Sequence, residues 1–203
     1  IRKIKLGERE CFAEMVRYHA DSKRLYITSS ETGSLSAVSL MLPAMPVRTK
    51  SIDLNGGDVT AVAIHGDKIA ASIKIGQNPG QILLFNASGE QIASFETGAL
   101  PDNVEFSLHG RWLISANEGE PSDDYQDDPQ GSFTLVDLND NSARQISLSG
   151  FEVPAGARIV TPGSDFAVDA EPEYVTIDAN SQFAYATLQE NNALAKINLS
   201  LGK

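Results

Sequence analysis

Three carboxylates could together bind a cation, because they recur at one place in a repeated sequence pattern. In four similar segments, the residues four positions before an aligned apolar residue are Glu14, Thr60, Asp102 and Glu173. Carboxylates that face one another raise one another's pKa unless a cation lies among them, and oxygen ligands suit a hard cation, Ca²⁺ above Mg²⁺. The pattern predicts a Ca²⁺ site that Thr60 interrupts. The alternative is a polar rim that binds only water.

The segment 118–129 is a second acidic feature, with six carboxylates and no basic residue. Its spacing lacks the alternate ligands, the central glycine and the closing glutamate of an EF-hand. Mutual repulsion favours an extended loop unless something neutralises the charge. We therefore expect either a solvated charged loop or a calcium or substrate loop over a channel mouth. In the second case the ligands would include Glu118, Glu120, Asp123 and Asp124.

The other reactive residue types form no familiar catalytic constellation, and no catalytic residue is assigned. The sequence has no Gly-x-Ser-x-Gly motif, Walker loop or paired-histidine zinc motif. Cys11 has no evident activating partner, whereas Arg111 and Arg158 are the basic residues nearest the acidic segments and could contact a bound anion. Each histidine falls in or beside a polar turn and is expected to be exposed there: His19, His65 and His109.

The elements that must position the carboxylates are short strands, repeated along the chain. Each segment reads as an alternating apolar strand, a polar turn, a second strand, a loop and a third strand. The aligned apolar residues are Tyr18, Ile64, Phe106 and Ile177, at steps of 46, 42 and 71 residues. Steps of ~40 to 50 residues with several short strands are typical of β-propeller blades, which bury their faces by stacking on neighbours.

The sequence therefore predicts an all-β fold, a β-propeller with about four blades in a single domain over residues 1–203. The repeat units lie at approximately 10–45, 56–95, 100–140 and 171–203. The 71-residue step is interpreted as the same unit with two insertions, 118–131 and 150–169. No long stretch has a period of 3.6, so a helical fold is not expected. Innermost strands surround a propeller axis, so the aligned carboxylates would ring the channel mouth and the histidines would lie at the opposite end.

Four units leave open how the propeller closes. Four blades could close alone, two copies could pair, or the chain could be part of a larger propeller, which is the alternative we favour. An open half would expose strand edges and an apolar blade face, and this face would be an association surface. The expected partners are therefore the remaining propeller blades or a second copy of the chain.

Composition and charge exclude several classes of protein. The 203 residues are enough for one domain, and 41% of them are hydrophobic, as in a globular chain. No apolar run approaches the ~18 to 20 residues that span a bilayer, and Ile1 to Lys5 lacks the apolar core of a signal peptide. The net charge of −11 repels nucleic acid and anionic membranes. The single Cys11 excludes an internal disulfide.

Five motifs resemble those of a known family. They are Leu-Pro-Asp-Asn-Val at 100–104, Ala-Asn-Glu-Gly-Glu-Pro-Ser-Asp at 116–123, Asp-Pro-Gln-Gly-Ser at 128–132, Glu-Pro-Glu-Tyr-Val at 171–175, and Thr-Leu-Gln-Glu-Asn-Asn-Ala-Leu at 187–194. The chain resembles the choice-of-anchor I proteins, bacterial relatives of the mesenchyme-specific cell-surface glycoprotein. The resemblance implies a periplasmic, secreted or cell-surface protein with a seven-bladed, lactonase-like propeller longer than this chain. It also implies calcium and phosphate chemistry, because some members carry an alkaline-phosphatase or phytase-like label.

Two functions compete on this reading. The first is an exported or cell-surface binding module with a divalent-cation site, whose ligand would be a glycan, a mineral, a phosphoester or a protein. The second is a metal-dependent phosphoesterase or lactone hydrolase. In that case a cation held by Glu14, Asp102 and Glu173 would polarise a phosphoryl or carbonyl oxygen, and the loop 118–128 would supply a base or a second metal. The sequence shows neither a nucleophile nor an acid for the leaving group.

Overall fold

The computed structural model describes residues 13–30, 32–54, 57–151, 153, 155–160 and 163–203. In this part of the chain, four antiparallel sheets are accompanied by one short helix, α1 (Phe166–Asp169). The first sheet contains β1 (Ala13–His19), β2 (Arg24–Ser29), β3 (Ser34–Ser39) and β4 (Val47–Asp53). The second contains β5 (Asp58–His65), β6 (Lys68–Ile75), β7 (Asn78–Asn86) and β8 (Gln91–Ala99). The third contains β9 (Pro101–Phe106), β10 (Trp112–Asn117), β11 (Ser132–Asp137) and β12 (Ser142–Ser147), and the fourth contains β13 (Pro172–Ile177), β14 (Phe183–Leu188) and β15 (Ala193–Asn198).

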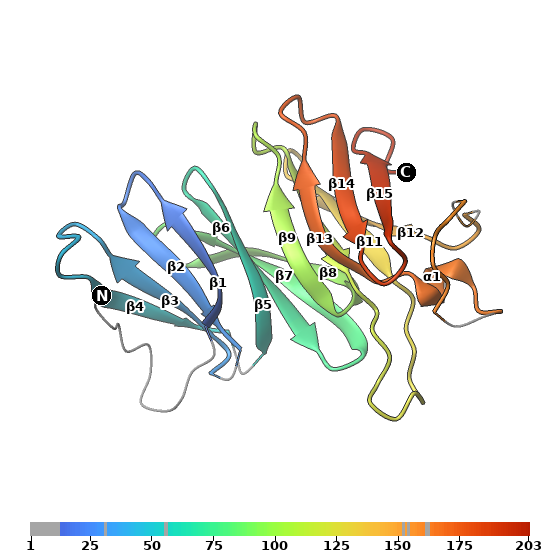
Figure 1. Ribbon diagram of the computed structural model, residues 1–203. Helices are drawn as coiled ribbons and strands as arrows, with labels where there is room; N and C mark the ends of the chain where they lie inside the picture. Colours follow the sequence, from blue (N-terminus) through green and yellow to red (C-terminus); the bar gives the residue numbers. More distant parts are fainter. Residues whose placement is uncertain (1–12, 31, 55–56, 152, 154, 161–162) are drawn as a thin grey trace.

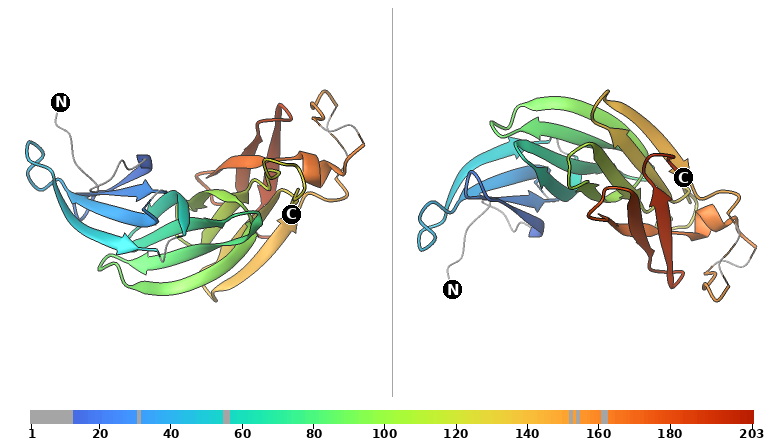
Figure 2. Two further views of the ribbon diagram at one scale, coloured as in Figure 1. Left: turned by 90° about the horizontal axis from the view of Figure 1, so that it is seen from below. Right: turned by 90° about the horizontal axis from the view of Figure 1, so that it is seen from above.

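The four sheets, blades 1 to 4 in chain order, are arranged as wedges about a common axis (Figure 1). The first strands of successive blades, β1, β5, β9 and β13, lie next to one another on the concave side of an open arc. The last strands β4, β8 and β12 lie on the convex side (Figure 2). This is the arrangement that the repeat pattern predicts, with the ring left open.

Apolar side chains from adjacent blades form three clusters, one at each blade interface. Equivalent positions on the third strands carry Leu35, Ile82 and Phe133, all with no exposed surface. The last strands add Ile52, Phe95 and Ile146 to the same clusters. Burying one such side chain contributes roughly 1.5 to 3 kcal/mol, so stacking between blades is the main source of stability.

A fourth strand in blades 1 to 3 was not expected from the sequence, which indicates three strands per unit. The reason is local: β4 and β12 each bury a single side chain, Ile52 and Ile146, and their other residues are exposed. One buried side chain per strand leaves no alternating pattern to detect. The strands are held by backbone pairing to β3 and β11 instead.

Among the described residues, the free face of blade 1 has an uncovered apolar position, as expected for an open propeller. Val16, two positions before the aligned Tyr18, is 49% exposed. Its equivalents in the other innermost strands, Val62, Val104 and Val175, are 0% exposed. The difference shows that no other blade in the described part of the chain covers this face of blade 1.

Candidate functional site

The four aligned positions that precede the apolar anchors share one backbone feature. The pairing between first and second strands changes register at this place in every blade, so that the first strand has one residue more than its partner. Such β-bulges bend a strand and redirect a side chain, and they are frequent beside binding sites. The residues at these bulges are Glu14, Thr60, Asp102 and Glu173.

All four bulges lie at the same end of the blades, because the innermost strands all start there (Figure 1). The loop 118–131 stands on the same end, since it follows β10, which runs antiparallel to β9. We call this end the acidic face and define it by the carboxylates Glu14, Asp58, Asp102, Glu118, Glu120, Glu171 and Glu173.

A cavity of about 330 Å³ opens on the acidic face between blades 1 and 3. Its walls include Glu14, Asp102, Asp58 and Lys74, and the last two are opposed across β5 and β6. Partial desolvation raises the pKa of Asp102 although the residue keeps an exposed surface; Lys74 lowers this pKa, and Glu14 and Glu120 raise it. The cavity therefore has a net negative charge that one lysine reduces.

Thr60 interrupts the ring of carboxylates for a reason that the structure makes clear. Its hydroxyl donates a hydrogen bond to the carbonyl oxygen of Pro101, and Ser72 Oγ lies 2.8 Å away. The side chain thus ties the start of blade 2 to the start of blade 3, next to Asp102.

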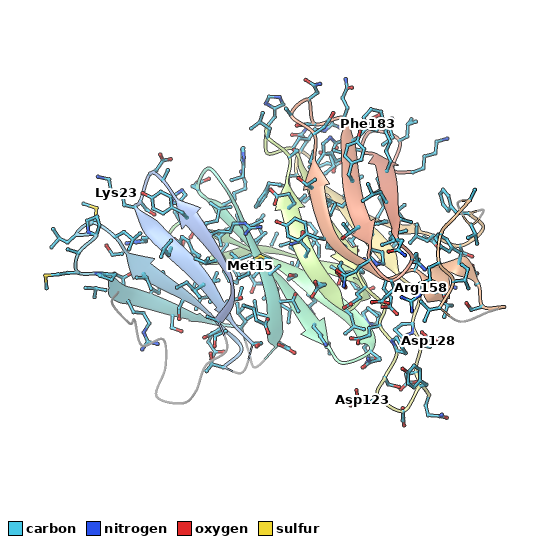
Figure 3. All side chains as sticks on the ribbon, viewed as in Figure 1. Met15, Lys23, Asp123, Asp128, Arg158 and Phe183 are labelled. Atoms are coloured by element: carbon cyan, nitrogen blue, oxygen red, sulfur yellow. The ribbon has the colours of Figure 1, made fainter. Side chains whose placement is uncertain are left out.

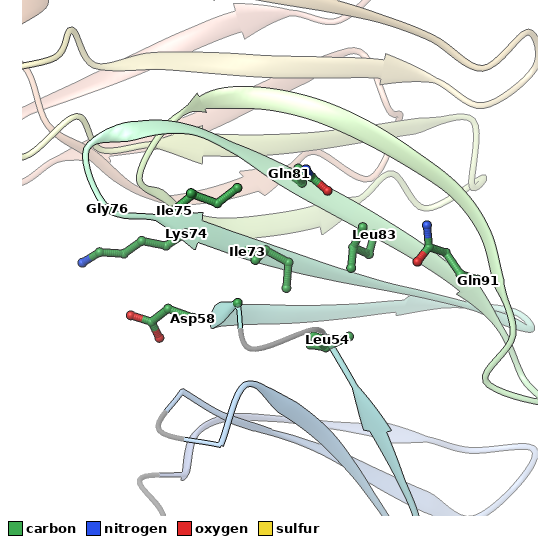
Figure 4. Close-up of a pocket in the computed structure, with 10 residues that line it drawn as sticks. Leu54, Asp58, Ile73, Lys74, Ile75, Gly76, Gln81, Leu83 and Gln91 are labelled. Carbon is green, nitrogen blue, oxygen red and sulfur yellow. The ribbon is translucent and has the colours of Figure 1, made fainter.

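A larger cavity, about 610 Å³, shares Asp58 and Lys74 with the first one. Figure 4 shows these two side chains extending to the same side, away from the apolar Leu54, Ile73 and Leu83. The amides Gln81 and Gln91 complete its polar wall. Most of its lining is uncharged, so the acidic chemistry is concentrated in the smaller cavity.

Two glutamates of the acidic face ionise far less readily than an ordinary glutamate. Partial burial, followed by the charges of Asp102, Glu120, Glu173 and Glu171, raises the pKa of Glu118 to about 8. Burial and then the charges of Glu190, Glu120, Asp128 and Asp169 raise the pKa of Glu171 to about 7. In both glutamates burial is the largest cause of the raised pKa, and neighbouring negative charges add to it.

The carboxylates of the acidic face affect one another's pKa, but their side chains do not meet closely enough to form a metal site in the described residues. The pKa of Glu173 is also raised, by desolvation first and then by Asp102, Glu190 and Glu120. Within the described ranges, however, no three His, Cys, Asp or Glu side chains lie close enough to hold a metal ion directly. Their oxygen atoms fit the chemistry of Ca²⁺, and direct coordination would require side chains to move together.

Residues at the tip of the acidic loop form hydrogen bonds with one another. Asp124 Oδ1 accepts from Ser122 Oγ at 2.8 Å and from the Gln126 backbone at 3.2 Å, and the first of these bonds lowers the pKa of Asp124. Asp123 lies exposed at the far end of the loop, and Asp128 lies on the leg that returns to the sheets (Figure 3). Among the predicted ligands, the structure brings Glu14, Asp102, Glu118, Glu120 and Glu173 into one electrostatic neighbourhood and leaves Asp123 and Asp124 at the tip.

The two legs of the loop meet in a narrow neck. Gly119 has a positive φ of 68°, and a side-chain carbon there would lie 2.7 Å from the backbone at Pro129, Gln130 and Gly131. Just inside the neck, the buried amide of Asn117 lies 2.8 to 3.1 Å from the hydroxyls of Ser115, Ser132 and Thr134. The Asn-Glu-Gly-Glu motif thus fixes where Glu118 and Glu120 lie.

Glu171 and Glu190 were missed in the sequence, because an insertion and a distant turn bring them together. Asn191 Nδ2 donates to Asp169 Oδ2 at 2.9 Å and to the Arg158 carbonyl oxygen at 3.0 Å. These bonds dock Arg158 and Asp169 of the insertion onto the turn between β14 and β15. The adjacent Glu-Pro-Glu motif, which contains both Glu171 and Glu173, was the available signal.

The histidines lie at the end opposite the acidic face, as predicted, but the expectation that all are exposed is wrong. His19 is buried, with Nδ1 2.6 Å from Ser22 Oγ and Nε2 2.6 Å from the Gly66 carbonyl oxygen, and so it links blades 1 and 2. His109 is exposed. Cys11 lies outside the described residues.

Neither arginine considered for anion binding lies free on the acidic face. Arg111 is at the opposite end and pairs with Asp137 at 2.7 Å, while Arg158 Nη1 lies 3.6 Å from Glu190 Oε2. Arg17 of blade 1 reaches across the concave side instead: it donates to the Tyr174 hydroxyl of blade 4 at 3.3 Å and lies 3.9 Å from Glu105 of blade 3.

The described residues contain no helix long and apolar enough to span a membrane.

Solved structures similar to this chain show that the fold is a β-propeller. Hydrazine synthase of Kuenenia stuttgartiensis matches with a TM-score of 0.68 and 13% identity, over 91% of this chain and 52% of its own. The β-propeller domain of Cps50 (Swd1) from Myceliophteria thermophila matches with a TM-score of 0.64 and 13% identity, over 96% of this chain and 54% of its own. A putative 6-phosphogluconolactonase from Bacteroides uniformis matches with a TM-score of 0.64 and 11% identity, over 93% of this chain and 50% of its own. The chain thus spans about half the length of these structures.

No curated protein matches the sequence. The family comparison, in contrast, matches the choice-of-anchor I domain over residues 14–203, from the first bulge carboxylate to the last residue. The motifs on which the resemblance rests build the bulges of blades 3 and 4, the neck of the acidic loop and the turn onto which the insertion docks. The chain therefore belongs to the choice-of-anchor I family.

Proposed function

We propose that this chain is part of an exported or cell-surface propeller module that binds Ca²⁺ on its acidic face. The family and the fold support a propeller module associated with the cell surface. The bound cation would in turn present a positive site to a glycan, a mineral or a phosphoester. Without it, the net charge of −11 opposes any anionic ligand.

The observation that carries the proposal is the unbalanced charge around Glu118. Burial, and then the charges of Asp102, Glu120, Glu173 and Glu171, raise the pKa of Glu118 to about 8. Carboxylates from blades 1, 3 and 4 and from the acidic loop also add to the raised pKa values of Asp102 and Glu173, after burial. A divalent cation among them removes this repulsion, and oxygen donors suit Ca²⁺. Asp102 is central, because it acts on the pKa of both Glu118 and Glu173.

Thermal unfolding with increasing Ca²⁺ tests the proposal. A ligand bound only by the folded chain stabilises it, by about 2.7 kcal/mol at a concentration 100 times Kd, so the melting temperature should rise. The double variant Asp102→Asn with Glu173→Gln should lose this rise. The control Asp21→Asn, at an exposed turn at the other end of blade 1, should keep it. No rise in the unchanged chain, or an equal rise in the double variant, would overturn the proposal.

One observation favours a second function, hydrolysis of a phosphoester or a lactone. A carboxyl group with a pKa of about 8, such as Glu118, is mostly protonated at neutral pH and could serve as the general acid that the sequence did not reveal. A cation near Asp102 would polarise the substrate oxygen. Turnover of a phosphomonoester or a lactone that needs Ca²⁺, stops with EDTA and falls at least about tenfold in Glu118→Gln would establish this function. Absence of turnover leaves the binding module.

A further inference from the structure

The connection between β3 and β4 exposes a run of apolar residues. The segment 40–47 reads Leu-Met-Leu-Pro-Ala-Met-Pro-Val and contains no charged or polar side chain. Four of its side chains are largely exposed: Met41 at 64%, Leu42 at 66%, Met45 at 58% and Val47 at 58%. Figure 2 shows this connection projecting away from the sheets. We call the segment 40–47 the apolar loop.

The apolar loop has a defined turn at its tip. The Met45 backbone N–H donates to the Leu42 carbonyl oxygen at 2.7 Å, which closes a β-turn with Pro43 at its second position. Proline is favoured there because its fixed φ matches the turn. The Leu40 N–H donates to the Lys23 carbonyl oxygen at 2.7 Å and attaches the start of the loop to the turn between β1 and β2. The apolar side chains are therefore presented to solvent by a closed turn.

The fold does not require apolar residues at this place. The equivalent connections between the third and fourth strands of blades 2 and 3 are 87–90, Ala-Ser-Gly-Glu, and 138–141, Leu-Asn-Asp-Asn. Their polar residues are exposed at Ser88, Glu90, Asn139, Asp140 and Asn141. Blades 2 and 3 each have a blade before them, so a preceding blade does not bury this connection.

The position of Val47 supports the same conclusion. Val47 pairs with Ser39 and therefore lies on the face of the sheet that carries Leu35 and Ala37, which pack against blade 2. Val47 is exposed although this face already has its neighbouring blade. The apolar loop is thus a surface distinct from the free face of blade 1 at Val16.

Basic residues flank the apolar loop. Lys23 and Arg24 end the turn beside it and Arg48 follows it, with Asp21 as the acid of that turn. The acidic face lies at the other end of the same strands, which have six or seven residues and so are roughly 20 Å long. The Debye length at physiological salt is about 8 Å. The negative charge of the acidic face is therefore largely screened at the loop, and the local charge is positive.

We propose that the apolar loop inserts into the surface of a lipid bilayer that contains anionic lipids, with Lys23, Arg24 and Arg48 at the headgroups. Apolar side chains enter the boundary between headgroups and acyl chains, and anionic lipids attract basic residues beside them. A narrow turn suits a bilayer better than a protein partner, because a specific protein interface takes roughly 20 to 30 residues from each side. The inference is independent of Ca²⁺ binding at the acidic face, which would face away from the lipid.

Co-sedimentation with vesicles of equal parts phosphatidylcholine and phosphatidylglycerol, in EDTA, tests the proposal. We expect the unchanged chain to sediment with the vesicles. The triple variant Met41→Ser, Leu42→Ser and Met45→Ser should lose at least about tenfold in affinity. It should keep its melting temperature, because the three residues are exposed. The matched control Leu194→Ser with Leu201→Ser removes exposed leucines of blade 4 and the turn after it, and should bind as the unchanged chain does.

Two further variants separate insertion from adsorption. Lys23→Gln with Arg48→Gln should weaken binding to the mixed vesicles and leave binding to phosphatidylcholine alone as it is. In Leu42→Trp, bromine atoms on the acyl chains should quench the fluorescence of the new tryptophan, while the buried Trp112 of blade 3 gives a constant background.

Three outcomes would overturn the proposal. The first is that the unchanged chain does not sediment with the mixed vesicles, and the second is that the triple serine variant sediments equally well. The third is a dimer of the unchanged chain that the serine substitutions dissociate while vesicles do not bind. This last outcome would assign the apolar loop to a second copy of the chain.

Discussion

Glu118 shows how one residue can link the charge of the acidic face to stability. Its pKa is raised to about 8 from the ordinary 4.5. Between these values the folded chain holds a proton that the unfolded chain has lost, so the free energy of unfolding falls as the pH rises. Glu171 acts in the same direction up to about 7. With EDTA present, we expect the melting temperature to fall from about pH 5 to about pH 8, and added Ca²⁺ to restore it.

The variant Glu118→Gln removes the titrating group, so its melting temperature should depend less on pH. Glu96→Gln makes the same chemical change at an exposed position of β8 and should leave the pH dependence as it is. A pH dependence of the same size in both variants would show that Glu118 does not cause it.

At the scale of residues, the sequence predicted the positions whose spacing is set within one strand. Asp102 and Glu173 each stand four residues before an apolar anchor, and both lie at bulges on one face. Glu171 and Glu190 could not be predicted together, because Asn191 and the docked insertion bring them close across the fold. Nor could the burial of His19, which depends on the Gly66 carbonyl of the next blade.

At the scale of elements, the neck of the acidic loop depends on a glycine. Alanine at position 119 would have to adopt a positive φ, which costs roughly 1 to 2 kcal/mol, and its Cβ would also press against the opposite leg of the loop. We expect Gly119→Ala to destabilise the chain by more than this and to speed proteolysis within 118–131. Urea unfolding and limited proteolysis measure both effects.

Gly150→Ala is the matched control for the neck. Gly150 also has a positive φ, 78°, but a side-chain carbon there meets nothing within 4 Å. The difference between the two variants therefore measures the crowding at the neck apart from backbone strain. If both cost the same, the legs of the loop are not tightly packed.

The strands themselves were predicted only where burial leaves a pattern. First, second and third strands are rich in buried apolar residues, and in β6, β10 and β11 nearly every residue is buried, so the sequence places these strands correctly. In β4 and β12 just one side chain is buried, so these strands are visible only through their backbone pairing. The sequence therefore predicts the β-structure of the four blades but not the number of strands in each blade, because strands with a single buried side chain leave no pattern.

At the scale of the molecule, one substitution at four equivalent positions reports which blade faces are covered. Val62→Ala, Val104→Ala and Val175→Ala each remove buried methyl groups, at about 0.8 kcal/mol per group plus the cost of a cavity. Val16→Ala removes half-exposed groups and should change the free energy of unfolding by less than about 0.5 kcal/mol. Urea unfolding of the four variants checks the contrast. A cost for Val16→Ala equal to that for Val104→Ala would mean that the face of blade 1 is already covered.

At the β-bulges, the backbone conformation does not depend on which side chain the position carries. The backbone of β5 accommodates its extra residue just as those of β1, β9 and β13 do, although β5 has a threonine there and the others have acids. The backbone of a bulge therefore accommodates either a threonine or an acid while its strand keeps the same pairing. If the acidic face binds a cation as proposed, single substitutions at the bulges would change its charge blade by blade, in evolution or in protein engineering.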